Sequence, residues 1–288
     1  MELQDILQLN EAAIDKWINP PKLSGRMTLV DRLKLWHDTK RYFIVRELAR
    51  QHASLGGHGP LKVLDFGSGH GGVTIDVATV LGPRIQMTGY DVSRKACDIA
   101  SRAAQRCEAS VHFLADPDCN IEQAVATPQD AIISCDVFGH VPSVPDTFKA
   151  LRRCLVPGGK LIAFSETVTG ASLTIPTYLR NKGFRMDDSE EEHISLHTVH
   201  ELKAFLEDAG FVNVQVFPYD PIRFLFYPKR YITKLRQVNK PLWLLALVLS
   251  VFQNRLTEIA YNQFNLWLAQ RVSMKDTAGC LIVADVPH

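Results

Sequence analysis

A run of glycines beside a buried aspartate is the feature of this chain best suited to ligand chemistry. In residues 61–72, LKVLDFGSGHGG, an apolar stretch interrupted by Lys62 and Asp65 ends abruptly in four glycines. This pattern predicts a buried strand and a tight turn, and the apolar spacing from Val73 to Leu81 predicts a helix immediately afterwards. Glycines let a ligand approach the backbone, and a helix N-terminus offers unpaired N–H groups. We therefore expect a nucleotide-type cofactor at this turn.

The carboxylate of Asp65 distinguishes two classes of cofactor. Gly67, Gly69 and Gly72 also fit the G-x-G-x-x-G spacing of dinucleotide sites, which is a weak signal when it stands alone. A carboxylate two residues before the first glycine would repel the pyrophosphate of NAD, whereas it would attract the ammonium group of an amino-acid-bearing ligand. S-adenosylmethionine is such a ligand. Asp65 therefore favours S-adenosylmethionine over NAD.

Two more aspartates follow the next predicted strands. Asp91 ends the strand predicted at residues 85–90, about 20 residues beyond the glycines, where a carboxylate can accept hydrogen bonds from ribose hydroxyls. The alternative is that Asp91 or Ser93 caps the next helix. Asp116 comes after a strand predicted at residues 110–114 and before a proline, a position that also suits an Asx turn.

The loop DVFGHV, residues 136–141, follows the fourth predicted strand at residues 131–135. Ligands of open parallel sheets bind beyond the carboxyl ends of the strands, so this loop should face the reacting group. His140 titrates near neutrality and is the candidate general base. The alternative is a histidine that only packs or hydrogen-bonds within the loop.

Two motifs resemble those of a known enzyme family. Asp65-x-Gly67-x-Gly69-x-Gly71 resembles the first motif of class I S-adenosylmethionine-dependent methyltransferases. Residues 148–161, with Pro-Gly-Gly at 157–159, are similar to the helix, turn and fifth strand of the group that includes ubiquinone-biosynthesis and other small-molecule methyltransferases. The resemblance implies S-adenosylmethionine as cofactor and an adenine contact from Asp116. The expected cofactor-binding residues are Asp65, Gly67, Ser68, Gly69, Gly71, Asp91, Val92, Asp116 and Cys135.

The order of predicted elements indicates an α/β fold, a Rossmann-like sheet of seven mostly parallel strands with helices on both faces. Residues 58–220 would form the cofactor-binding core and residues 277–288 its last strand. The resemblance implies that the last two strands form the antiparallel end of the sheet. Residues 1–57 are expected to form an N-terminal helical cap, with one helix over residues 29–51.

A helical insertion at residues 221–276 departs from a minimal methyltransferase. It contains a basic aromatic stretch and then an apolar run of 14 residues at 241–254, shorter than the about 20 needed to span a bilayer. We expect it to form a second cap on the N-terminal helices. The alternatives are a substrate tunnel or homodimer face, and an interfacial membrane contact through residues 221–260.

Charge, motifs and cysteine content argue against nucleic-acid targets, secretion and a metal site. The formal net charge of +1 gives no broad attraction to nucleic acid, and no N-P-P-[YF] motif of base or glutamine methylation follows the fourth strand. Six cysteines without a C-x-x-C pair and an N-terminus without a signal-peptide pattern favour a reduced, cytoplasmic protein. His193, His197 and His200 have metal-like spacing, but no nearby cysteine joins them and no metal site is expected.

The sequence therefore predicts an S-adenosylmethionine-dependent methyltransferase that acts on a small apolar or aromatic acceptor, by O-, N- or C-methylation. A methyl on a sulfonium is already activated, so the enzyme mainly has to align the acceptor and exclude water. The alternatives are an NAD-dependent oxidoreductase and a non-catalytic S-adenosylmethionine-binding protein.

Overall fold

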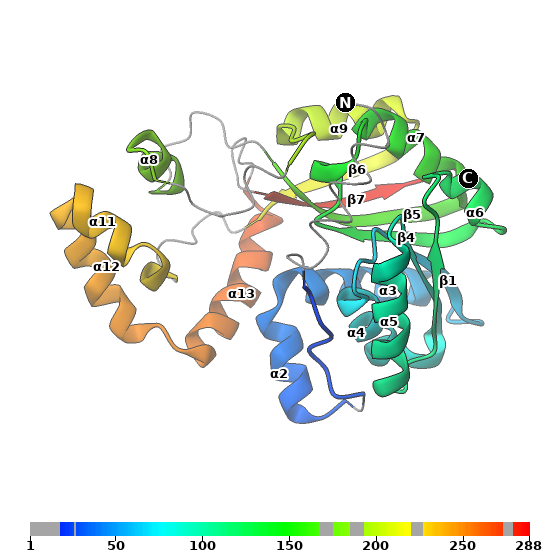
Figure 1. Cartoon of the computed structure of the whole chain (residues 1–288), viewed down its shortest axis with the longest axis horizontal. Helices are drawn as coiled ribbons and strands as arrows, with labels where there is room; N and C mark the ends of the chain where they lie inside the picture. Colours follow the sequence, from blue (N-terminus) through cyan, green and yellow to red (C-terminus); the bar gives the residue numbers. More distant parts are fainter. Residues whose placement is uncertain (1–17, 26, 168–174, 185–192, 220–226, 273–278) are drawn as a thin grey trace.

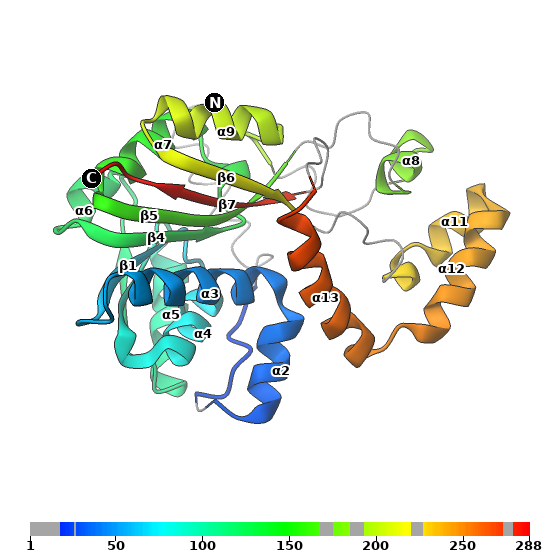
Figure 2. The same ribbon diagram turned by 180° about the vertical axis from the view of Figure 1, so that it is seen from behind.

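The structure is a computed structural model that describes residues 18–25, 27–167, 175–184, 193–219, 227–272 and 279–288 (Figures 1 and 2). Residues 1–17 of the expected N-terminal helical cap lie outside these ranges.

Seven strands form one sheet in the order β3-β2-β1-β4-β5-β7-β6. Only β7 runs against its neighbours β5 and β6; the other strands are parallel to one another. The predicted Rossmann-like sheet with an antiparallel end is therefore confirmed. The strands are β1 (Leu61–Phe66), β2 (Ile85–Asp91), β3 (Val111–Ala115), β4 (Gln129–Cys135), β5 (Leu155–Glu166), β6 (Val212–Pro218) and β7 (Gly279–Asp285).

Helices cover both faces of the sheet, as Figures 1 and 2 show. Alternate residues of β1 point to opposite faces, so Val63 packs beneath α3 and α4 while Leu64 packs in the cluster with α7 and α9. The helices of the core are α2 (Leu29–His37), α3 (Thr39–Ser54), α4 (Gly72–Leu81), α5 (Arg94–Arg106), α6 (Ile121–Ala124), α7 (Val144–Arg153) and α9 (Val199–Asp208), with short 3₁₀ turns η1 (Gly82–Arg84) and η2 (Phe138–His140).

Two local predictions were wrong in detail. The helix expected over residues 29–51 is broken at Asp38, which has an extended backbone, ends α2 and caps α3 by accepting a hydrogen bond from the Arg41 N–H. The Pro-Gly-Gly sequence does not lie between a helix and a strand. It forms an irregular bulge inside β5, where Leu155 pairs with Gln129 but Lys160 already pairs with Ala131.

The inserted segment contains η4 (Pro228–Arg230), α11 (Ile232–Val238), α12 (Lys240–Phe252) and α13 (Arg255–Ala269), and α8 (Ile175–Asn181) lies earlier in the chain, between β5 and α9. α13 packs against α2 and α3, whereas α8, α11 and α12 share a small apolar cluster of their own. Asparagine side chains begin both long helices, since Asn239 caps α12 and Asn254 caps α13. Within the described residues, no single helix is long and apolar enough to cross a membrane; α12 and α13 together would be, but they are bent by 106°.

Candidate functional site

A cavity of about 680 Å³ opens at the carboxyl ends of β1, β2 and β4. This size lies within the range of about 300–1,000 Å³ that small-ligand sites occupy. Nearly all the expected cofactor residues line it, and the exceptions are Gly71 and Asp116. The expected residues on its wall are Asp65, Gly67, Ser68, Gly69, Asp91, Val92, Cys135 and His140.

The glycines of the turn serve different purposes. Gly67 has φ 76°, and a Cβ there would lie 2.4 Å from the side chain of Val137, so this turn needs glycine for backbone and for space. Gly69 has φ 50° and open space where a Cβ would project. Gly71 has φ 75° and caps α4 while it packs against Phe113, away from the cavity. Gly69 is therefore the glycine that leaves room for a ligand.

Asp65 is buried at the carboxyl end of β1, where its Oδ2 accepts a hydrogen bond of 2.6 Å from the Thr74 hydroxyl. Burial raises the pKa of its carboxyl to about 7, and the nearby charge of Asp91 adds to the effect, while Thr74 and Arg41 oppose it. Within the described residues, the charge of Arg41 compensates this carboxylate only in part. A positively charged ligand group in the cavity would complete the compensation.

Asp91 holds the glycine turn and faces the same cavity. Its Oδ2 accepts a hydrogen bond from the Gly69 N–H at 2.8 Å, and its Oδ1 accepts one from the Ser93 N–H at 2.9 Å. Burial raises the pKa of the Asp91 carboxyl. Ser93 caps α5 by accepting a hydrogen bond from the Ala96 N–H. The capping role therefore belongs to Ser93, and Asp91 lines the cavity.

The structure does not bring Asp116 to the cavity. Its Oδ2 accepts hydrogen bonds from the Tyr90 hydroxyl at 2.8 Å and from the Asn120 N–H at 2.6 Å, and its Oδ1 accepts one from the Asp118 N–H at 3.2 Å. These bonds match the turn-forming alternative. Asp118 and Cys119 line the cavity at this position instead.

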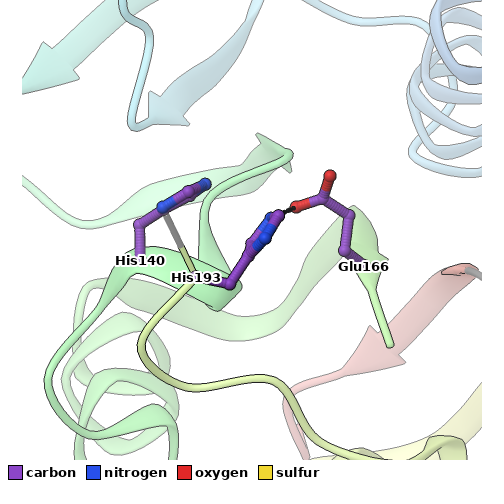
Figure 3. A group of neighbouring side chains, drawn as sticks. All are labelled: His140, Glu166 and His193. Atoms are coloured by element: carbon purple, nitrogen blue, oxygen red, sulfur yellow. Dashed lines mark hydrogen bonds and ion pairs between the residues drawn. The ribbon is translucent and has the colours of Figure 1, made fainter. Parts of the chain in front are cut away.

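His140 lies in η2 beside His193 and Glu166, two residues that the sequence pattern did not group with it (Figure 3). The Nε2 of His193 is 2.6 Å from Oε2 of Glu166, at the end of β5, and the rings of His140 and His193 stack with centroids 4.6 Å apart. Burial alone would raise the pKa of Glu166, but the hydrogen bond and charge of His193 outweigh it and lower that pKa. Glu166 therefore remains ionised beside the two imidazoles.

The same three side chains offer one ligand atom each within 4.8 Å of one another. This grouping could hold a divalent metal ion. The spacing of His193, His197 and His200 in the sequence did not predict it, because only His193 belongs to it. His197 points elsewhere, since its ring packs on Phe205. His140 could therefore serve either as a metal ligand or as a general base. Treatment with a chelator distinguishes these two roles.

Asp136 follows β4 with a left-handed backbone, φ 61°, which is strained for a residue with a side chain. Its carboxylate accepts two hydrogen bonds from the Lys40 ammonium, at 2.6 and 2.8 Å. Burial opposes the charge on Lys40, but the attraction of Asp136 outweighs it and raises the pKa of the lysine. This ion pair fixes the loop that carries His140.

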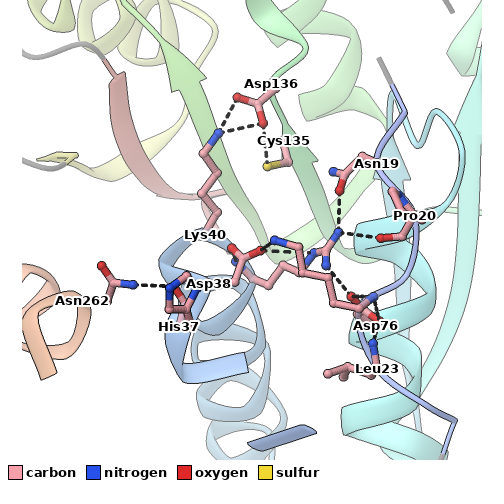
Figure 4. Close-up of polar contacts among 12 residues, drawn as sticks. Asn19, Pro20, Leu23, His37, Asp38, Lys40, Asp76, Cys135, Asp136 and Asn262 are labelled. Atoms are coloured by element: carbon pink, nitrogen blue, oxygen red, sulfur yellow. Dashed lines mark hydrogen bonds and ion pairs between the residues drawn. The ribbon is translucent and has the colours of Figure 1, made fainter. Parts of the chain in front are cut away.

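The segment before α2 closes over the glycine turn (Figure 4). Arg41 pairs with the buried carboxylate of Asp76 at 2.6 Å and donates a hydrogen bond to the Asn19 side chain at 2.7 Å. Asp76 also accepts hydrogen bonds from the N–H groups of Lys22 and Leu23. A Cβ on Gly72 would lie 1.9 Å from the Asn19 carbonyl oxygen, so this approach requires glycine.

A second cavity of about 310 Å³ adjoins the first, and Asn19, Val73, Cys135 and Asp136 line both. Its other walls are rich in polar side chains, among them Lys40, which lies 3.6 Å from the centroid of the Phe164 ring.

Sequence reasoning missed several residues of the site. His70 lies inside the glycine turn on the cavity wall, and its buried Nε2 has no hydrogen-bond partner within the described part of the chain. Its place among the glycines was a signal that could have identified it. Glu166 ends a strand at the same sheet edge as Asp65 and could have been found in that way. His193 offered no such signal, because only folding brings it to the loop.

A known domain family covers most of the chain. The family described as "Methyltransferase domain" matches residues 35–216. Phosphoethanolamine N-methyltransferase 1 of Zea mays is 28% identical over 155 residues, which make up 53% of this chain and 28% of that protein. The chain thus spans well under half the length of the curated relatives it matches.

Solved structures share the fold at low sequence identity. The carbon methyltransferase CurJ aligns with a TM-score of 0.54 and 15% identity, over 99% of this chain and 67% of CurJ. The [4+2]-cyclase SpnF aligns with a TM-score of 0.54 and 16% identity, over 100% of this chain and 97% of SpnF. These likenesses concern the fold, which hosts more than one chemistry.

Proposed function

Because this chain belongs to the methyltransferase domain family, we propose that it transfers a methyl group from S-adenosylmethionine to a hydroxyl or an acidic C–H of a small acceptor. The family assignment confirms the class I methyltransferase expected from the sequence, with S-adenosylmethionine as its cofactor. When bound, this cofactor supplies a methyl group activated by a positively charged sulfur. The roles of individual residues and the nature of the acceptor are our proposal.

Two carboxylates would hold the cofactor. Asp65 is buried without a fully compensating cation and suits the ammonium group, whereas Asp91 at the tip of the next strand suits the ribose hydroxyls. Ser68, Gly69 and Val92 complete this wall of the cavity.

The cluster of His140, His193 and Glu166 is the observation that carries the proposal. His140 would accept the proton of the acceptor as the methyl group is transferred. The ionised Glu166, held by His193, would stabilise the positive charge that the imidazole gains. We place the acceptor beside this cluster and retain the prediction of an apolar or aromatic molecule, which the neighbouring Val137 and Val141 support.

An NAD-dependent oxidoreductase fits the cavity less well. Among the described residues that line the cavity there is no lysine or arginine, while Asp65 and Asp91 both face it. A pyrophosphate would therefore meet two carboxylates and no fixed cation. A non-catalytic S-adenosylmethionine-binding protein would keep the same wall, and only a turnover assay separates it from an enzyme.

Incubation of the protein with a metabolite extract and methyl-labelled S-adenosylmethionine tests the proposal. We expect a labelled small molecule, and we expect His140→Ala to lower its formation about 100-fold, the scale of general-base catalysis, while cofactor binding persists. His200→Ala, a change at an exposed position on α9, is the matched control. Labelling that is absent with the wild-type protein, or unchanged in His140→Ala, would contradict the assignment.

A further inference from the structure

The turn between α12 and α13 exposes an apolar patch that the proposed reaction does not use. We name it the elbow patch and define it as Val248, Val251, Phe252 and Leu256, whose side chains are 60%, 79%, 67% and 72% exposed. Residues 248, 251 and 252 lie on one face of α12, and Leu256 is the second residue of α13. Large apolar side chains gathered at this exposure mark an interaction surface.

The segment that carries the elbow patch is rich in positive charge. Residues 227–257 contain six lysines and arginines and no aspartate or glutamate, although the whole chain carries a net charge of only +1. Lys229 is fixed at the elbow itself, because its ammonium donates a hydrogen bond to the Gln253 carbonyl. Arg255 is the first residue of α13 and is exposed. The first acid beyond the patch, Glu258, already bonds His37 and Gln253.

The elbow lies at one end of the molecule, remote from the sheet. Figures 1 and 2 both show the α12–α13 turn and the beginning of α2 at this same end, away from β6 and β7. The first two residues of α2, Leu29 and Val30, are 72% and 60% exposed. Two separate elements on this part of the molecule therefore carry exposed apolar residues.

We propose that this end of the protein docks on the surface of an anionic lipid membrane, with the elbow patch inserted among the lipids and the basic side chains at the headgroups. α12 is too short to span a bilayer, with 13 residues against the about 20 required. An apolar stripe bordered by lysine and arginine is the pattern of a helix that lies in the interface. Each basic side chain near an anionic surface adds to the attraction.

Charge argues against a second copy of this chain as the occupant. In a two-fold symmetric dimer the same patch faces itself, so the basic residues of one protomer would approach those of the other. No acid within residues 227–257 could compensate them. An anionic surface satisfies both the apolar and the basic parts of the patch.

Vesicle sedimentation with the full chain tests the proposal. We expect binding to phosphatidylcholine vesicles with about 30% phosphatidylglycerol, at least tenfold weaker binding to phosphatidylcholine alone, and loss of binding in high salt. Phe252→Asp should weaken binding at least tenfold, and Arg255→Glu several-fold. Leu55→Asp, at a 54% exposed site after α3, is the matched control and should bind as the wild type does.

Thermal melting and S-adenosylmethionine binding verify that each variant is folded. Should Phe252→Asp fail this check, Arg255→Glu decides the question, because its exposed side chain contributes nothing to the core. Equal binding to neutral and anionic vesicles would overturn the proposal, as would undiminished binding of the folded elbow variants. A wild-type dimer in solution that dissociates on Phe252→Asp, without vesicle binding, would assign the patch to self-association instead.

Discussion

Replacing Asp65 with asparagine should make the free protein more stable and its cofactor binding weaker. The carboxyl of Asp65 has its pKa raised from 3.8 to about 7 by burial. The folded protein therefore binds this proton more tightly than the unfolded chain does, and stability falls as pH rises from about 4 through 7. About three pKa units correspond to about 4 kcal/mol, an upper bound on the order of magnitude of this cost at pH 8.

Asparagine keeps an acceptor for the Thr74 hydroxyl and carries no charge, so the variant should recover part of that energy. Denaturant unfolding at pH 8 should show a gain of about 1–4 kcal/mol in the unfolding free energy, shrinking toward zero near pH 4. Calorimetry should show S-adenosylmethionine binding at least tenfold more weakly, because the ammonium loses its countercharge.

Asp76→Asn is the matched control for this experiment. Burial raises the pKa of the Asp76 carboxyl too, but this carboxylate is paired with the buried Arg41. Its removal leaves the guanidinium without that partner, so we expect the free protein to lose about 3–5 kcal/mol. A change in stability of the same sign in both variants would refute the reasoning that Asp65 is held without its counterion. Unaltered cofactor affinity in Asp65→Asn would refute its contact with the ammonium group.

Three further predictions follow from the site. The affinity of the wild-type protein for S-adenosylmethionine should be highest above pH 7 and fall up to tenfold per pH unit below it, because protonated Asp65 carries no charge. Titration calorimetry across this pH range measures the affinity, and an affinity that does not change with pH would contradict this prediction. Gly67→Ala should destabilise the fold by about 1–3 kcal/mol in denaturant unfolding, through its positive φ and its clash with Val137. Gly69→Ala shares the backbone strain but meets no clash, so it should destabilise the fold less and also weaken cofactor binding; equal effects on stability would be inconsistent with the open space at Gly69. EDTA should leave labelled methyl transfer unchanged if His140 acts as a base, and a loss restored by a divalent metal would instead assign His140, Glu166 and His193 to a metal site.

The sheet could be predicted because its strands carry their own signals. Leu61–Phe66 and Gly279–Asp285 are apolar, bounded by turn residues, and buried on both faces, so local pattern and final position agree. The glycine turn could be predicted for the same reason, since the backbone at Gly67 has a positive φ that glycine adopts without strain.

The site was less accessible to sequence reasoning because its partners meet only in the folded chain. Asp116 occupied the expected place after β3, but Tyr90 and two N–H groups turn its carboxylate away from the cavity. His193 reaches the loop of His140 from a segment more than 50 residues later in the chain, a contact that no local spacing reveals. The break at Asp38 was equally difficult to predict from the sequence, because the helical pattern of apolar residues continues across it. The Asp38 side chain instead caps α3.

Titration of the free protein with S-adenosylmethionine and, separately, with NAD tests whether the cavity beside Asp65 is a site for S-adenosylmethionine. We expect saturable binding of S-adenosylmethionine with release of a proton from Asp65 near pH 7, and no measurable heat with NAD. Binding of NAD in preference to S-adenosylmethionine would contradict the assignment of this cavity to S-adenosylmethionine.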